Sequence, residues 1–99
     1  MVTTAKEELE MNLQVYREQI DAIDDKMLRL FKERMSVARQ IALYKKEHDL
    51  PALDAARESE KLAVIAEKAG DEMRPYAQKL YKQLFEFSRT YQEDLMVWK

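Results

Sequence analysis

The sequence predicts an all-α protein with three helices per chain, one very long, that assembles into an intertwined helical homodimer. The 99 residues include one glycine and two prolines, and 36% of them are charged. This composition suits long helices and argues against all-β and low-complexity chains. A chain of this length also predicts one domain, residues 1–99.

The first predicted helix extends from about Lys6 to His48, a stretch without glycine or proline. Its apolar residues alternate between spacings of four and three, which is the heptad pattern of helices that pack lengthwise. This seam consists of Leu9, Leu13, Tyr16, Ile20, Ile23, Met27, Leu30, Val37, Ile41 and Tyr44. A helix of about 40 residues is about 60 Å long, whereas a compact domain of about 100 residues has a radius of gyration of about 13 Å. The rest of the chain is too short to cover the seam, so we expect a second copy to bury part of it.

Three helix breakers, Pro51, Gly70 and Pro75, divide the rest of the chain. Asp54 is a favourable N-cap for a second helix, and Gly70 is favourable just beyond its end. Pro75 suits the first turn of a third helix. The second helix carries an apolar stripe of Leu62, Ile65, Ala66 and Ala69. The third carries Ala77, Leu80, Tyr81, Leu84, Phe85, Phe87, Tyr91 and Leu95.

Composition excludes several classes of function. The net charge of −2 argues against generic binding to nucleic acid. The absence of cysteine excludes disulfides and thiolate chemistry, and a single histidine, His48, cannot supply a multi-histidine metal site. His48 is expected to be exposed or to interact with the helix C-terminus. Residues 1–10 lack the apolar core of a signal peptide and no stretch could span a bilayer, so we expect a soluble cytoplasmic protein without a membrane partner.

One cation interrupts the apolar seam. Arg34 occupies the seam position between Leu30 and Val37 and requires a counter-charge. It is either a structural residue, in a buried ion pair or as a polar residue that fixes the register, or a ligand for a bound anion. Lys45 follows just over three turns later on nearly the same face, about 16 Å along the axis, so both side chains could reach one small anion. Arg17 is about 25 Å from Arg34 and about 42 Å from Lys45, so it can share that ligand only from the other subunit. Taken alone, Arg17 is typical of a solvated surface charge.

Two further polar groups depart from their surroundings. Ser88 and Gln92 are four residues apart and therefore share one helix face with core residues, which leaves a water-facing pair and a ligand-binding pair both open. Asp54, Arg57 and Glu58 crowd the start of the second helix. Capping and the helix dipole account for Asp54 and Glu58 but not for Arg57. The alternative is that Glu58 accepts a hydrogen bond from a ligand hydroxyl.

Five segments together closely resemble the all-helical chorismate mutases: residues 17–24 (REQIDAID), 34–38 (RMSVA), 41–45 (IALYK), 50–58 (LPALDAARE) and 88–92 (SRTYQ). No segment is specific by itself. The basic, acidic and amide positions are highly specific in this order and at these separations.

The resemblance implies a Claisen rearrangement of chorismate to prephenate, in phenylalanine and tyrosine biosynthesis, without a cofactor or metal. It implies that Lys45 and Gln92 donate to the two sides of the substrate's ether oxygen. Arg34 is similar to the arginine that binds a substrate carboxylate within its own subunit. Arg17 is similar to the arginine that the other subunit contributes across the dimer interface.

The resemblance also assigns supporting roles. Glu58 is similar to the carboxylate that accepts from the ring hydroxyl, and with Lys45, Gln92 and Arg34 it completes the implied catalytic set. Asp54 and Arg57 resemble neighbouring substrate-binding residues, with Asp54 acting through its backbone. Ser88 resembles the hydroxyl near a substrate carboxylate.

Two other readings remain open. An isochorismate pyruvate lyase resembles the mutases in scaffold, basic residues and glutamine, but its members do not keep the acidic pattern of Asp54 and Glu58. A non-catalytic helical dimerisation or regulatory module accounts for the heptads but not for Arg34. The tail after Gln92 matches no catalytic residue, and Trp98 within it is expected to be a packing residue.

Overall fold

The structure, a computed structural model, describes residues 5–97, without the side chains of residues 8–11. Two helices, α1 (Ala5–Glu47) and α2 (Ala55–Val97), contain all of these residues except 48–54, and no strand occurs among residues 5–97. The chain comprises two units, Met1–Arg34 and Met35–Lys99. The all-helical prediction is therefore confirmed for the described residues, while the expectation for Trp98 lies outside them.

The C-terminus of α1 is closed by a turn in the left-handed region. Asp49 has a φ of 54°, and the N–H groups of His48 and Leu50 donate to the carbonyls of Tyr44 and Lys45 at 3.1 and 2.8 Å. These bonds satisfy carbonyls that a helix end otherwise leaves unpaired. His48 is exposed, as predicted, and its ring stacks on Tyr44 with 4.0 Å between the ring centroids.

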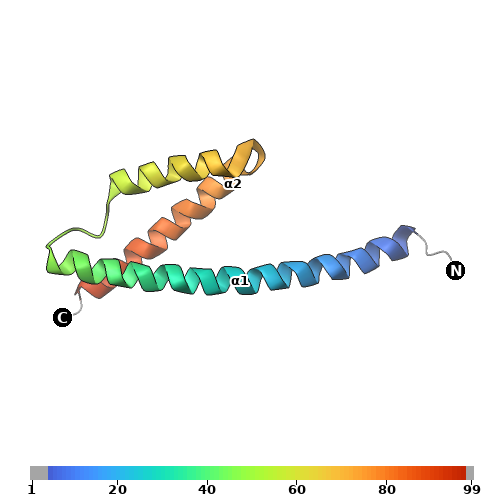
Figure 1. Cartoon of the computed structure of the whole chain (residues 1–99), viewed down its shortest axis with the longest axis horizontal. Helices are drawn as coiled ribbons and strands as arrows, with labels where there is room; N and C mark the ends of the chain where they lie inside the picture. Colours follow the sequence, from blue (N-terminus) through green and yellow to red (C-terminus); the bar gives the residue numbers. More distant parts are fainter. Residues whose placement is uncertain (1–4, 98–99) are drawn as a thin grey trace. The chain divides into compact units, whose positions relative to one another are not determined.

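Helix α2 reverses direction at Gly70, as Figure 1 shows. Gly70 has φ 76° and ψ 168°, which an L side chain rarely adopts. A Cβ built there would meet nothing within 4 Å, so the backbone angle rather than crowding favours glycine. We call residues 55–69 the first arm of α2 and residues 71–97 the second arm.

Within residues 5–97 the structure has two helical elements, and the second is interrupted at Gly70, so a separate third element is not shown. The break that the sequence predicts at Gly70 is present, but helical structure resumes directly after this one residue. Pro75 lies early in the second arm. The side chain of Arg74 closes the turn, because its Nε donates to the carbonyl of Ala66 at 3.1 Å, and its Nη2 lies 3.0 Å from Asp71.

The buried side chains of the unit Met35–Lys99 mark where its helices meet. Ala38, Ala42, Ala52, Phe85 and Gln92 are buried. Two residues of the predicted third stripe, Leu80 and Phe87, are instead each 48% exposed. A residue two positions from Phe85 lies on the opposite side of a helix, and one five positions away lies well off its face.

The heptad seam of α1 is exposed from Leu13 to Tyr44, while the side chain of Leu9 lies outside the described ones. In the unit Met1–Arg34, its residues from Leu13 to Leu30 are 47–58% exposed. In the other unit, the seam residues Val37, Ile41 and Tyr44 are 42–57% exposed, whereas Ala38 and Ala42, one position further along, are buried. The chain therefore covers a stripe of small residues on α1 and leaves the large apolar stripe uncovered.

Candidate active site

Lys45 lies in the last turn of α1, where the dipole favours a cation. Its side chain is half-buried, and its Nζ donates to the carbonyl of Ala52 at 2.8 Å. Ala52 is buried in the segment between the two helices, so this bond ties Lys45 to a fixed carbonyl. An ammonium group has three N–H donors. Two of them remain for a ligand.

Gln92, on the second arm of α2, is only 5% exposed. Its Nε2 donates to the carbonyl of Ala38 at 3.0 Å. Because a carbonyl only accepts, this contact fixes which end of the amide is nitrogen. The small side chains of Ala38 and Ala42 leave room for the amide to approach the backbone of α1. The second N–H of Gln92 is available to a ligand.

Lys45 and the anchor of Gln92 share one face of α1. Ala38, Ala42 and Lys45 follow at spacings of four and three, which place them above one another on a helix. The carbonyl of Ala38 and the backbone of Lys45 are therefore about 10 Å apart along the axis. Two hydrogen-bond donors, one cationic and one neutral, are thus anchored to the same face.

The start of α2 organises the acidic positions. The Asp54 Oδ1 accepts from the N–H of Arg57 at 3.0 Å, and the N–H of Glu58 donates to the carbonyl of Asp54 at 3.0 Å. Asp54 is therefore the N-cap of α2, as the sequence predicts. The side chains of Asp54 and Arg57 are exposed, whereas Glu58 is half-buried. The cap uses the Asp54 carboxylate and fixes the backbone from which Glu58 projects.

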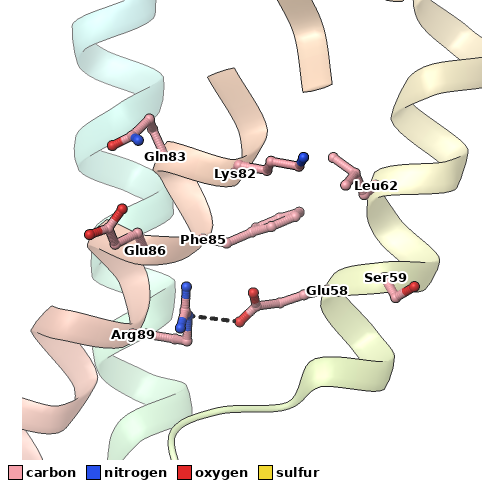
Figure 2. A pocket seen from close by; sticks show the side chains of 8 residues that line it. All are labelled: Glu58, Ser59, Leu62, Lys82, Gln83, Phe85, Glu86 and Arg89. Carbon is pink, nitrogen blue, oxygen red and sulfur yellow. Dashed lines mark ion pairs between the residues drawn. The ribbon is translucent and has the colours of Figure 1, made fainter. Parts of the chain in front are cut away.

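Glu58 pairs with a cation from the other arm of α2. The Arg89 Nε lies 3.0 Å from the Glu58 Oε2, and Figure 2 shows the two side chains pointing toward one another. Their side chains are 34% and 25% exposed, respectively. The Nε atom is itself buried, and its N–H is not aligned for a hydrogen bond with any partner among residues 5–97. The contact is therefore an ion pair without hydrogen-bond geometry.

This ion pair borders a pocket between the two arms. The pocket has a volume of about 410 Å³, within the range of roughly 300–1,000 Å³ of sites that hold small ligands. Of the predicted site residues, Glu58 lines it. The lining residues are Glu58, Ser59, Leu62, Lys82, Gln83, Phe85, Glu86 and Arg89.

The sequence patterns singled out Glu58 but not Arg89. Arg89 follows Phe85 by four residues and precedes Gln92 by three, so it belongs to the face on which both are buried. A cation on such a face is the same signal that draws attention to Arg34. The pairing itself depends on two arms that only the fold at Gly70 brings together.

The remaining predicted residues are divided between the units. Ser88, one turn before Gln92, is half-buried in the unit Met35–Lys99. Arg17 and Arg34 belong to the unit Met1–Arg34, where Arg17 is exposed and Arg34 half-buried. All the other predicted site residues lie in the unit Met35–Lys99.

Within residues 5–97, neither helix combines the length and apolar composition that a bilayer crossing requires. Comparison with known families matches residues 16–93 to the family described as chorismate mutase type II. Searches of curated proteins and of solved structures found no match. The family match begins just before Arg17 and ends just after Gln92, so it spans every residue of the predicted site. The chain therefore belongs to the chorismate mutase type II family.

Proposed function

We propose that this chain is a chorismate mutase, a cytoplasmic enzyme that converts chorismate to prephenate in phenylalanine and tyrosine biosynthesis. The observation that carries the proposal is the pair of donors, Lys45 and Gln92, anchored to one face of α1 with further N–H groups available. Membership of the chorismate mutase type II family supports the same reading.

The rearrangement breaks one C–O bond as one C–C bond forms, within a single molecule. It needs no nucleophile and no proton transfer, so we propose that it proceeds without a cofactor. Negative charge develops on the ether oxygen, and donors fixed beforehand stabilise it without reorganising. Lys45 and Gln92 suit this role because Ala52 and Ala38 each take one N–H and hold the side chain in place. Each donor of this kind typically contributes a factor of about 10²–10³.

The substrate must also be held in its compact reactive conformer. Guanidinium groups pair with carboxylates in a defined geometry. We assign one substrate carboxylate to Arg34 and to Arg17 of the partner subunit, with the hydroxyl of Ser88 near a carboxylate. Such clamping converts binding energy into proximity of the reacting carbons.

The ring hydroxyl is assigned to Glu58. Its backbone is fixed by the N-cap of Asp54, which supports a role for Asp54 through backbone rather than through its own carboxylate. We assign Arg57 to the substrate side of this turn, because an exposed cation at a helix N-terminus gains nothing from the dipole.

The exposed seam of α1 supports a homodimer. Large apolar side chains at heptad spacing are the contact surface of paired helices, and a second copy offers an identical stripe. We propose that the two α1 helices pair along it and that this pairing delivers Arg17 to the neighbouring site.

Disrupting the seam should therefore abolish both assembly and turnover. Ile20→Lys places a charge in the seam, and we expect a monomer with at least about tenfold lower activity at micromolar concentration. Val15→Lys is the matched control, because Val15 is exposed to a similar extent, 48% against 55%, but lies off the seam. Sedimentation velocity and turnover, measured on the same samples, check both. A dimeric, active Ile20→Lys protein would contradict the assignment of the seam.

The direct test is to follow chorismate with purified protein. We expect chorismate to disappear with stoichiometric formation of prephenate, and Lys45→Ala, purified identically, to report any contaminating host activity. Release of pyruvate from isochorismate instead would establish a lyase. Inertness toward both substrates would favour the non-catalytic dimerisation module.

A further inference from the structure

Arg89 forms an ion pair with Glu58, a proposed substrate-binding residue. It projects from the second arm of α2, between Phe85 and Gln92, and is about one-third exposed. A half-buried guanidinium requires a counter-charge. Glu58 provides it from the first arm, with 3.0 Å between Nε and Oε2.

The alternatives in the same pocket are less constrained. Lys82 and Glu86 also line it, but both are exposed, and exposed charges interact weakly through water. The two members of the pair come instead from opposite arms and are both half-buried. Their contact therefore depends on the tertiary fold.

The contact between Arg89 and Glu58 engages one atom of each side chain. A bidentate pair would engage both carboxylate oxygens of Glu58. Here, within residues 5–97, the contact uses Oε2 of Glu58 and Nε of Arg89, which leaves Oε1 to accept from a ligand hydroxyl. Oε2 is therefore the oxygen next to the guanidinium, and Oε1 is the oxygen outside the pair.

The negative charge of the proposed substrate explains why Glu58 would need a neighbouring cation. A dicarboxylate next to an uncompensated glutamate would be repelled, and the repulsion is stronger where water is partly excluded. A cation 3.0 Å from Glu58 offsets that repulsion while the carboxylate still accepts a hydrogen bond.

We propose that Arg89 is a positioning residue that acts through Glu58: it orients the carboxylate toward the ring hydroxyl and balances its charge against the dianionic substrate. This inference rests on the proposed mutase function. The ring hydroxyl takes no part in the bonds that break and form. Arg89 therefore contributes equally to ground-state and transition-state binding, which appears in KM rather than in kcat.

Arg89→Met tests the inference, because it removes the charge and keeps an apolar stem of similar reach. We expect KM for chorismate to rise about tenfold or more, with kcat changed less than about threefold. Lys79→Met is the matched control, since it removes an exposed cation from the same arm outside the pocket; it should change KM less than about twofold. Arg89→Lys should recover most of the loss, because a point charge suffices to balance Glu58.

A double-mutant cycle with Glu58→Gln separates action through Glu58 from direct action. In the Glu58→Gln background we expect Arg89→Met to change kcat/KM by less than about twofold, against about tenfold in the parent. An equal factor in both backgrounds would overturn the proposal, as would an Arg89→Met protein with unchanged KM. Circular dichroism checks folding, and if Arg89→Met does not fold, Arg89→Gln takes its place with the same expected rise in KM. An inactive wild-type protein would refute the mutase function itself, whereas an active wild type with an unchanged variant would refute only the role of Arg89.

Discussion

Chains carrying Arg17→Ala and chains carrying Lys45→Ala should each be inactive and should regain activity when they are mixed and allowed to exchange subunits. In the proposed dimer, a site takes Lys45 from one chain and Arg17 from the other. A heterodimer of the two variants then holds one complete site and one site that lacks both residues. Random exchange makes about half of the dimers mixed, so about one quarter of the wild-type turnover should return. Either variant alone should lose at least about 10²-fold.

The control for this experiment is a pair that cannot complement. Lys45 and Gln92 belong to the same unit of one chain, and Gln92 donates to the helix face that carries Lys45. Lys45→Ala mixed with Gln92→Ala should therefore remain inactive, because every site lacks one donor. Exchange itself is checked by native mass spectrometry of differently tagged chains. Continued inactivity of the first mixture after confirmed exchange would remove Arg17 from the neighbouring site.

Gln92→Glu should make both kcat and the free energy of unfolding depend on pH, with both increasing as the pH decreases from neutral. The introduced carboxyl would occupy a buried position facing the carbonyl of Ala38, where only its protonated form can donate. Near neutral pH we expect kcat to fall by about 10²–10³, since the donor to the ether oxygen is replaced by an acceptor. As the pH decreases, the protonated fraction grows and activity should return.

Stability should change in the same direction. Burial and the opposed carbonyl would raise the pKa of the introduced carboxyl in the folded state above its value of about 4.3 in the unfolded chain. The folded state then binds more protons than the unfolded state between the two pKa values. Relative to the wild type, the free energy of unfolding should decrease as the pH rises from about 4 towards 7.

The matched control is Gln40→Glu, the same substitution at an exposed position of α1 outside the pocket. It should follow the wild-type profile in both measurements. Urea unfolding at fixed protein concentration, because a dimer's stability depends on concentration, provides the free energies. A Gln92→Glu protein with wild-type kcat at neutral pH would contradict the assignment of Gln92 to the ether oxygen.

Local signals predicted the helices well because their causes are local. The end of α1 near His48, the N-cap at Asp54 and the break at Gly70 each follow from the properties of a few adjacent residues. The predicted boundary between the second and third helices is present at Gly70, but it lies inside one element, α2. Sequence alone did not indicate that a single residue, Gly70, would suffice to turn the chain before helical structure resumed.

Contacts between segments that are distant in the sequence could not be predicted from local patterns. Heptad spacing identified the large apolar stripe of α1, but the residues that the chain itself covers are Ala38 and Ala42, whose small size leaves no such signal. The carbonyl of Ala38 therefore could not be foreseen as the anchor of Gln92. Likewise, the position of Glu58 after an N-cap drew attention to it in the sequence. Its pairing with Arg89 could not be predicted, because it requires the two arms of α2 to lie together.

The turn at Gly70 has a consequence for how such chains can vary in length. Each residue advances a helix by about 100°, so one residue inserted in the second arm between Gly70 and Phe85 would rotate everything beyond it by that angle. Arg89 would swing out of reach of Glu58, and Gln92 out of reach of Ala38. Gains or losses of about seven residues would nearly restore the phase while shifting the side chains along the axis. The number of residues between Gly70 and the site residues of the second arm therefore determines which way Arg89 and Gln92 face.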